Sequence, residues 1–477
     1  MNRLSYSAVL RQYPEVSGDC RSDIRSLLLR QRIKLVVMDD DPTGIQTVHS
    51  CRLVTDWQAD SLQAALADEA PFFYVLTNTR AMTRDEAARV TESAVQAVLE
   101  ANRQAGYRLV FISRSDSTLR GHFPLETDLM AQGLRHNGQA VCPVTFFAPA
   151  FLEAGRFTLL GCHYLKDGDT LVPVSESEFA RDNVFAYHSA ILKDYIAEKL
   201  GNEDFLYRSL PLTEFPGQTP ARRLQILEDL TEQARGKGLP AYVSVDALRY
   251  SDLQAFALTL LTWMGRHDEE AVVIRSSSSL PKAMSGIDDR PLLDRRDFVG
   301  EGAATAPGLF IVGSHVKKST AQLNALLERQ GTVGIELDIR SILDRPQPLL
   351  DEVQARLKEL AGQGLCPVVY TSRQEVRLDD ADERQRLGRQ VSDFLVSIVS
   401  HLSYRPSWLV AKGGITSHDI LTKGLCVRTA QVMGQILSGV PCLRTAQDAA
   451  IPNLPYVIFP GNVGEEDSLA QVFEKLR

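Results

Sequence analysis

The sequence lacks the short motifs that mark the commonest enzyme folds. It contains no G-x-x-x-x-G-K-[ST] string, which excludes an ordinary P-loop enzyme, and no G-x-G-x-x-G string, which weakens a dinucleotide-dependent oxidoreductase interpretation. The patterns H-E-x-x-H and G-x-S-x-G are also missing, so zinc proteases and α/β-hydrolases have no support. Any chemistry must therefore come from a less common arrangement of residues.

The sequence also lacks an excess of basic charge, long apolar runs and paired cysteines. The formal net charge is −8, which gives no electrostatic footprint for nucleic acid. No apolar run approaches the roughly 18 residues that span a bilayer, so no membrane partner is expected. The seven cysteines are scattered, odd in number and without a C-x-x-C pair, which favours reduced thiols in a cytoplasmic compartment.

What the sequence does contain is an alternation of buried strands and amphipathic helices. In the N-terminal half, short apolar runs predict strands at 33–38, 72–76 and 108–112, and the polar–apolar pattern predicts helices over 83–104 and 123–136. Such repeats are typical of a parallel sheet with right-handed crossovers. Because the carboxyl ends of parallel strands share one edge, the polar residues after these strands are expected to lie together.

Charged residues follow each of these three strands. Asp39-Asp40-Asp41 follows the first strand, Asn78 to Arg80 the second, and Arg114 to His122 the third. An acidic cluster at such a place suits a general base or a magnesium site, and guanidinium forks suit a carboxylate or a phosphate. Helix N-capping by the aspartates and a solvated strand–helix loop are the structural alternatives.

Glycines follow the strands of the C-terminal half. The strands predicted there lie at 309–312, 332–337, 367–371, 408–411 and 456–459. Three of them end in small residues, namely Gly313-Ser314, Gly413-Gly414 with Thr416, and Gly461-Asn462 with Gly464. Glycines before a helix free backbone N–H groups to face an anion, which favours a phosphate or nucleotide site. Any single strand–glycine–helix turn is equally well a structural device.

We therefore expect an α/β protein of two domains, residues 1–302 and 303–477. Each domain is expected to be a mainly parallel sheet flanked by helices, with the active site in the cleft between them. A hinge near 300–307 would let the two domains close. The segment 155–190 breaks the alternation with a predicted hairpin that turns at Gly168-Asp169, and its acidic part has no assigned role.

Four strings stand at these strand ends: Asp40-Asp41-Pro42-Thr43-Gly44, Arg114-x-Asp116-Ser117-Thr118-Leu119-Arg120-Gly121, Gly413-Gly414-Ile415-Thr416 and Pro460-Gly461-Asn462-Val463-Gly464. Together they resemble the four-carbon acid sugar kinase family, in which a sugar-binding N-terminal domain precedes a nucleotide-binding C-terminal domain. The resemblance implies ATP-dependent phosphorylation of the terminal (4-) hydroxyl of threonate, erythronate or a 3-oxo-tetronate. Two positions differ from the family pattern: Arg114 stands where many members carry lysine, and Ile415 stands where many members carry an acidic residue.

The resemblance and the residue types together give the candidate site residues. We expect Asp40 or Asp41 to accept the proton of the attacking hydroxyl. The expected sugar-acid-binding residues are Asn78, Arg80, Arg114, Asp116, Ser117, Thr118 and Arg120. The expected ATP-binding residues are Ser314, Gly413, Gly414, Ile415, Thr416, Gly461, Asn462 and Gly464. Mg²⁺ is expected to bridge the phosphates of ATP, and its protein ligand stays open.

Two other classes of function stay open at this stage. A metal-dependent aldolase or dehydratase of sugar acids would use Asp39 to Asp41 to hold its metal, but it needs no nucleotide and leaves the glycine turns unexplained. A non-enzymatic, two-lobed ligand sensor would bind the acid and consume nothing. The expected partners of the kinase are small molecules, a sugar acid and ATP. The oligomeric state is open, and a homodimer is one option.

Overall fold

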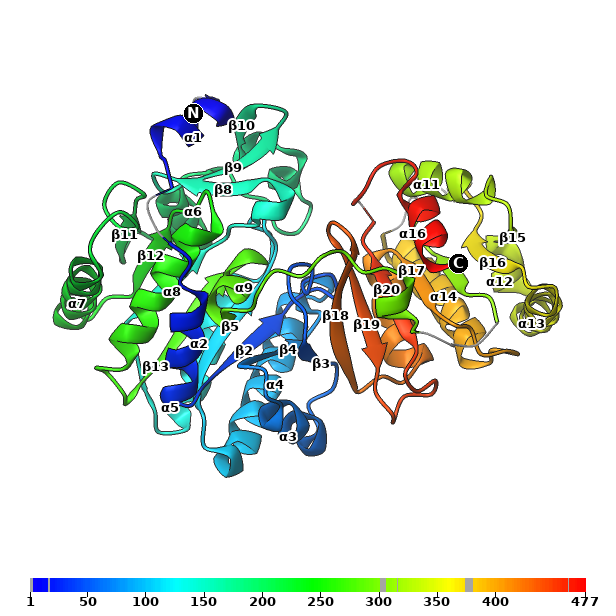
Figure 1. The fold of residues 1–477 in the computed structure, drawn as a ribbon, viewed down its shortest axis with the longest axis horizontal. Coiled ribbons are helices and arrows are strands. Elements are labelled where there is room, and N and C mark those ends of the chain that lie inside the picture. The colour runs from blue at the N-terminus through cyan, green and yellow to red at the C-terminus, as the bar shows by residue number, and fades with distance from the viewer. Residues whose placement is uncertain (1–2, 16–17, 301–305, 315, 374–380, 462) are drawn as a thin grey trace. The chain divides into compact units, whose positions relative to one another are not determined.

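The computed structural model describes residues 3–15, 18–300, 306–314, 316–373, 381–461 and 463–477 (Figure 1). The chain divides into two compact units, Met1–Asp289 and Arg290–Arg477. The division lies before the expected one at 302–303 because Leu293 and Phe298 pack into the core of the second unit. Residues 301–305 of the expected hinge lie outside the described part. Among the described helices, none is long and apolar enough to cross a membrane.

The first unit is built on a sheet whose neighbouring strands all run parallel. Every residue of β2 (Ile33–Asp39) is buried, as expected of a strand that is covered on both faces. The strand order is β11 (Leu206–Leu210), β12 (Ala241–Val245), β7 (Val144–Ala148), β13 (Glu270–Ser276), β5 (Arg108–Arg114), β2 (Ile33–Asp39), β4 (Phe72–Leu76) and β3 (Cys51–Val54), with β6 (Ala140–Val141) beside β13.

Helices cover both faces of this sheet (Figure 1). Val36, Phe73 and Phe111 share one hydrophobic cluster with the helices of one face, and the alternate residues of β2 point to the other face. The first group comprises α3 (Ala59–Ala67), α4 (Arg84–Ala105) and α5 (Leu125–His136). The second comprises α2 (Arg21–Arg30), α7 (Pro220–Lys237), α8 (Tyr250–Met264) and α9 (Ser279–Ser285).

A small antiparallel sheet forms most of the segment that breaks the alternation. The predicted hairpin is confirmed, with its turn at Gly168 and Asp169, where Gly168 has a φ of 56°. The hydrophobic cluster beneath this small sheet includes Phe123, Phe147 and Tyr195. The elements of this region are β8 (Arg156–Leu159), β9 (Cys162–Asp167), β10 (Thr170–Pro173), β1 (Leu4–Ser5), α1 (Tyr6–Gln12), η2 (Leu152–Ala154), η3 (Val174–Glu176), η4 (Glu178–Arg181) and α6 (Leu192–Leu200).

The second unit has a mixed sheet with a parallel part and an antiparallel part. Its order is β18 (Thr429–Leu437), β19 (Val440–Thr445), β20 (Pro455–Phe459), β17 (Leu409–Lys412), β14 (Leu309–Val312), β16 (Cys366–Thr371) and β15 (Thr332–Leu337). The pairs from β20 to β15 are parallel, whereas β18, β19 and β20 pair antiparallel. The helical elements are α10 (Arg295–Phe298), α11 (Lys317–Leu327), α12 (Ile339–Asp344), α13 (Pro346–Gly362), α14 (Ala381–Ser400), α15 (Gly414–Asp419), η5 (Ile420–Gly424) and α16 (Ser468–Leu476).

The core of the second unit gathers residues from both of its ends. Phe310 and Trp408 meet edge to face with ring centroids 5.2 Å apart, and Phe473 of α16 packs beside them. The Trp408 indole N–H donates to the carbonyl oxygen of Leu476 at 3.1 Å. The expected α/β fold of two domains, each with a mainly parallel sheet flanked by helices, is confirmed. The short strand β3 and the β18–β19 hairpin were not expected.

Candidate functional site

The ends of β2, β4 and β5 meet at one edge of the first sheet. Asp39 pairs in register with Leu76 of β4 and with Arg114 of β5. The Thr77 N–H donates to the Asp39 carbonyl oxygen at 2.9 Å, and the Asp40 N–H donates to the Arg114 carbonyl oxygen at 3.2 Å. The backbone hydrogen bonds between these strands thus continue beyond the strand ends. We call the charged residues that gather here the strand-end cluster: Asp39, Asp40, Asp41, Arg80, Arg114, Asp116 and Arg120.

Arg80 joins three carboxylates of this cluster. It lies on η1 (Thr79–Ala81), and its Nε donates to Asp40 at 3.1 Å. Its Nη1 lies 3.4 Å from Asp41 and 3.8 Å from Asp116. Burial would lower the pKa of the Arg80 guanidinium, but the three carboxylates outweigh it and raise that pKa well above its ordinary value. Arg80 therefore stays charged, and its side chain keeps 17% exposure.

A second ion pair lies deeper in the strand-end cluster. Arg114 Nη1 is 3.1 Å from Asp39 Oδ1, and Arg114 Nη2 donates to Ser278 Oγ at 2.9 Å. Burial raises the pKa of Asp39 to about 7, although Arg114 opposes that shift. Gly44 is needed beside the pair, because a Cβ there would lie 2.0 Å from Asp39 Oδ2. Arg114 is only 4% exposed, so it anchors the strand ends from beneath, and its expected contact with a sugar acid stays a prediction.

The two candidate proton acceptors differ in exposure. Asp40 is 1% exposed, and its Oδ2 accepts from Ser115 Oγ at 2.5 Å and from Arg80. Asp41 is 22% exposed and accepts from the Thr43 N–H at 2.8 Å. Burial would raise the pKa of Asp41, but Arg80 and Thr43 hold it below its usual range. Asp41 is thus the ionised carboxylate that a bound hydroxyl can reach more easily.

The loop between β5 and α5 folds around Asp116. Arg120 Nε donates to Asp116 Oδ2 at 2.8 Å, and the Thr118 hydroxyl donates to the same oxygen. Burial would raise the pKa of Asp116, but Arg80, Arg120 and Thr118 hold it well below its usual range. The Arg120 side chain is 23% exposed, the most of the three cluster arginines. It therefore offers donors to a ligand more readily than Arg80 or Arg114 does.

The remaining expected sugar-site residues contribute mostly backbone. Asn78 is half-buried and adopts a left-handed conformation with a φ of 53°. Ser117 and Thr118 are buried, and their carbonyl oxygens accept from His163 Nε2 at 2.8 Å and from the Tyr187 hydroxyl at 2.7 Å. The segment between 155 and 190 therefore holds the loop in place.

Glu126 belongs to this edge, and the sequence analysis missed it. Its Oε1 accepts from Thr79 Oγ1 at 2.5 Å, and its Oε2 accepts from Ser113 Oγ at 3.3 Å. Burial, with the charge of Asp40 in second place, raises the pKa of Glu126. No signal marked it in the sequence, because a glutamate in the first turn of a helix is an ordinary feature.

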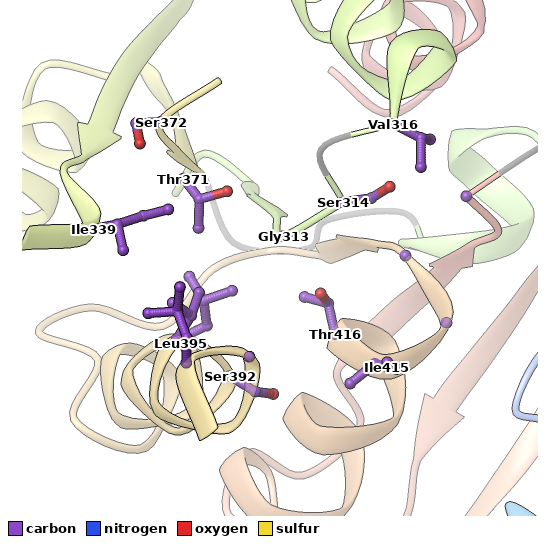
Figure 2. A pocket seen from close by; sticks show the side chains of 16 residues that line it. Gly313, Ser314, Val316, Ile339, Thr371, Ser372, Ser392, Leu395, Ile415 and Thr416 are labelled. Atoms are coloured by element: carbon purple, nitrogen blue, oxygen red, sulfur yellow. The ribbon is translucent and has the colours of Figure 1, made fainter. Parts of the chain in front are cut away.

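The second unit holds a cavity of about 450 Å³ at the ends of its parallel strands. The expected ATP-site residues Ser314, Gly413, Gly414, Ile415, Thr416 and Gly461 line it. Gly464 does not belong to its lining, and Asn462 lies outside the described residues. Figure 2 shows Ile339 and Leu395 at one end of the cavity and Ser314 and Thr416 at the other.

The polar end of this cavity is shaped by backbone rather than by charge. Gly413 has a φ of 114°, and a Cβ there would lie 3.2 Å from the Ser314 Cβ. Lys412 is fully buried, and its Nζ donates to the carbonyl oxygens of Pro460 at 2.6 Å and Gly461 at 3.3 Å. Burial lowers the pKa of Lys412 to about 7. This lysine therefore ties two strand ends together beneath the cavity.

The apolar end of the cavity comes from residues that the sequence analysis did not assign to a site. Leu387, Val391 and Leu395 of α14 and Ile339 of α12 form its wall. Thr371, Ser372 and Ser392 add hydroxyls. An apolar slot that leads to a ring of backbone and hydroxyl groups suits a nucleoside with phosphates. In the described part of the chain, no three His, Cys, Asp or Glu side chains are grouped to hold a metal ion.

Comparisons with known structures agree with this architecture. The Haemophilus influenzae protein HI1011, of the family DUF1537, shares 17% identity over 93% of this chain and all of its own, with a TM-score of 0.63. A Salmonella typhimurium LT2 protein named as a candidate tRNA synthase shares 16% identity over 92% of this chain and 98% of its own, with a TM-score of 0.65. At these identities the two likenesses establish the fold. No curated protein matches the sequence.

Family models match most of the chain. The model of a sugar-binding N-terminal domain matches residues 35–284, which include the strand-end cluster. The model of a nucleotide-binding C-terminal domain matches residues 309–469, which include the cavity. These are the two domains expected from the strings at the strand ends, in the expected order. The chain belongs to the four-carbon acid sugar kinase family.

Proposed function

We propose that this protein transfers the terminal phosphoryl group of ATP to the 4-hydroxyl of a four-carbon sugar acid of the threonate, erythronate or 3-oxo-tetronate type. The observation that supports it best is the presence, in one chain, of a carboxylate–guanidinium cluster in the sugar-binding domain and a glycine-ringed cavity in the nucleotide-binding domain. A sugar acid needs a cation and hydroxyl partners, and a nucleotide needs an apolar slot beside an anion site. The cleft between the domains stays a prediction.

Arg120 is the favoured partner for the substrate carboxylate. A guanidinium can donate two parallel hydrogen bonds to a carboxylate, which fixes its orientation as well as its position. Arg80 is already shared by three aspartates, whereas Arg120 is more exposed. In this proposal Arg80 orients the aspartates and Asn78 faces the substrate hydroxyls.

Asp41 is the favoured proton acceptor. It is the more exposed of the two candidates, and its depressed pKa keeps it ionised. Phosphoryl transfer requires little covalent chemistry from the protein. An ionised carboxylate that orients the attacking hydroxyl and accepts its proton late in the transfer is therefore sufficient. Asp40 is enclosed by Arg80 and Ser115, which suits a positioning role.

The cavity of the second unit is proposed to hold ATP. The base would lie against Leu387, Val391 and Leu395, and the phosphates would face the N–H groups near Gly413 and Gly414. Asp41 is the most exposed carboxylate of the strand-end cluster and would be the one to hold a magnesium ion, which prefers one or two carboxylates together with phosphate oxygens and water. When bound, Mg²⁺ neutralises charge on the phosphates. All described cysteines are free thiols, and the cytoplasmic location and the homodimer stay predictions.

The test is ADP release from ATP and Mg²⁺ across D- and L-threonate, D- and L-erythronate and the 3-oxo acids. Release with one acid supports the kinase and identifies its substrate. ATP binding without release across the panel moves the substrate outside four-carbon acids. Tight binding of an acid without any ATP binding overturns the kinase and favours a ligand sensor, and nucleotide-independent turnover of an acid favours an aldolase or dehydratase.

A further inference from the structure

A segment of the first unit covers the loop that carries Arg120. This covering segment, residues 179–187, overlaps the acidic part of 155–190 that had no role assigned from the sequence. The ring of Phe179 lies 4.9 Å from the Arg120 guanidinium carbon, and Phe185 meets the His122 ring edge to face with centroids 4.9 Å apart. The covering segment is therefore a wall of the strand-end cluster and adds a charged residue to it.

That charged residue is Asp182, whose carboxylate is held by its own backbone. Its Oδ1 accepts from the N–H groups of Val184 at 2.9 Å and Phe185 at 3.0 Å. Its Oδ2 lies 3.4 Å from Arg120 Nη1. Burial would raise the pKa of Asp182, but the two amides and Arg120 hold it below its usual range, so the side chain stays ionised. Asp182 does not need Arg120 to keep its place.

Arg120 has an unused donor that a ligand can reach, whereas the unpartnered Nε of Arg114 is buried. Its Nε bond to Asp116 is short, at 2.8 Å, whereas the contact of its Nη1 with Asp182 is longer. Within the described residues, its Nη2 has no hydrogen-bond partner. Arg120 and Asp182 are 23% and 25% exposed, so water and small ligands can reach their contact. The Asp182 contact is thus the one that a ligand carboxylate can replace at least cost.

We propose that Asp182 competes with the substrate carboxylate for Arg120 and thereby sets how strongly the site prefers an acid. This inference rests on the proposed function. In the free protein the Asp182 carboxylate takes a donor of Arg120; when the acid binds, two carboxylates face one guanidinium, and their repulsion weakens acid binding. An uncharged four-carbon polyol feels no such repulsion. Asp182 is a specificity-determining residue that acts through Arg120.

The test is Asp182→Asn, which removes the charge and keeps an Oδ1 acceptor for Val184 and Phe185. We expect the KM and Kd of the acid to fall roughly two- to fivefold, the range of a partly screened charge interaction. The kcat, the KM of ATP and the Kd of threitol or erythritol are expected to stay unchanged. Because salt screens charge, the gain should shrink at high ionic strength. If Asp182 had a purely structural role, Asp182→Asn would change neither the ratio of the Kd of the acid to the Kd of the polyol nor the dependence of that ratio on salt.

Two further variants separate charge from shape. Glu178→Gln removes a carboxylate from an exposed side chain just before the covering segment, and it should leave the acid KM unchanged. Asp182→Ala removes the charge and also the turn bonds, and it should lower thermal stability, whereas Asp182→Asn should not. If Glu178→Gln and Asp182→Asn tighten acid binding equally, the proposal is overturned, because the effect would then come from net charge at long range and not from the contact with Arg120.

The outcomes for this inference and for the kinase are distinguishable. If the wild-type protein phosphorylates an acid and Asp182→Asn leaves its KM unchanged or raises it, the inference is overturned and the kinase stands. If ATP does not bind and no acid supports ADP release, but calorimetry shows tighter acid binding by Asp182→Asn, the kinase falls and the competition stands. A protein that neither binds nor phosphorylates any four-carbon acid overturns both.

Discussion

The strand-end cluster of the first unit and the cavity of the second unit both lie at the ends of parallel strands, yet they are built from different groups. The cluster consists of carboxylates and guanidiniums that pair with one another, with Arg80 contacting three aspartates. The cavity consists of glycines, small hydroxyls and aliphatic side chains, and the buried Lys412 beneath it donates to backbone carbonyl oxygens. In the proposed kinase the first site would recognise the charge of the acid, and the second would recognise the shape of the nucleotide.

The largest expected effect is on the charged side of this comparison. Asp41→Asn keeps an acceptor for the Thr43 N–H but removes the charge that takes the proton. We expect kcat to fall about 100-fold or more, with the Kd of the acid nearly unchanged. Steady-state kinetics at saturating ATP measure this. A variant with wild-type kcat would move the role of base to another group, Asp40 first.

The next effect tests the cavity by shape alone. Gly413→Ala adds a methyl group at a φ of 114°, a conformation that L residues rarely adopt. We expect the loop to relax away from this conformation, which costs alanine about 1–3 kcal/mol, so that restoring it on binding lowers the affinity for ATP about 10- to 100-fold. Calorimetry with ATP measures it. Gly388→Ala is the matched control, because Gly388 lines the same cavity and its Cβ would meet nothing within 4 Å. Equal losses in both variants would contradict the role of the Gly413 backbone.

Arg120→Ala separates the two sites. Loss of a charged, bidentate donor should raise the KM of the acid about tenfold and leave the Kd of ATP unchanged. Arg120→Lys keeps the charge without the fork and should recover only part of the loss. Arg181→Ala, an exposed cation in the same region, should change neither constant. If Arg120→Ala weakened ATP binding instead, the assignment of the two sites would be wrong.

The smallest effect concerns pH and the buried Glu126. Its folded pKa is raised, so its favourable contribution is complete below its unfolded pKa of 4.5 and is lost as the pH rises through the folded pKa. Glu126→Gln should therefore gain stability relative to wild type as the pH rises, by about 1 kcal/mol or more, since one pKa unit is worth about 1.4 kcal/mol. Urea unfolding between about pH 5 and pH 8 measures the difference. A difference that is independent of pH would contradict a raised pKa.

Much of the fold could be predicted because its strands are short, apolar and buried on both faces. The runs at 33–38, 72–76 and 108–112 became β2, β4 and β5. The β18–β19 hairpin was missed although the turn dipeptide Ser438-Gly439 lies between β18, whose residues alternate in burial, and the mostly buried β19. The expectation of βα units obscured it.

The candidate site could be predicted only in part, because sequence patterns locate strand ends and not their distant partners. The aspartates and arginines were found since they directly follow strands. Asp182 lies 62 residues from Arg120, and no periodicity links them. Leu387 and Leu395 lie on α14, and the 3.6-residue period of such a helix marks an apolar face without telling whether that face meets the core or a cavity.

The closing of the second core by α16 has a consequence for synthesis on the ribosome. Leu469, Val472 and Phe473 belong to that core, and the Trp408 indole bonds the backbone at Leu476. Every strand of the first unit has emerged by residue 276, whereas the second core stays open until 468–476 have emerged. The roughly 200 residues between take about 10–40 s at ordinary elongation rates. During that interval the nascent second unit exposes its apolar strands, whereas the first unit has already buried its own. The second unit is therefore the part of the chain most in need of a chaperone.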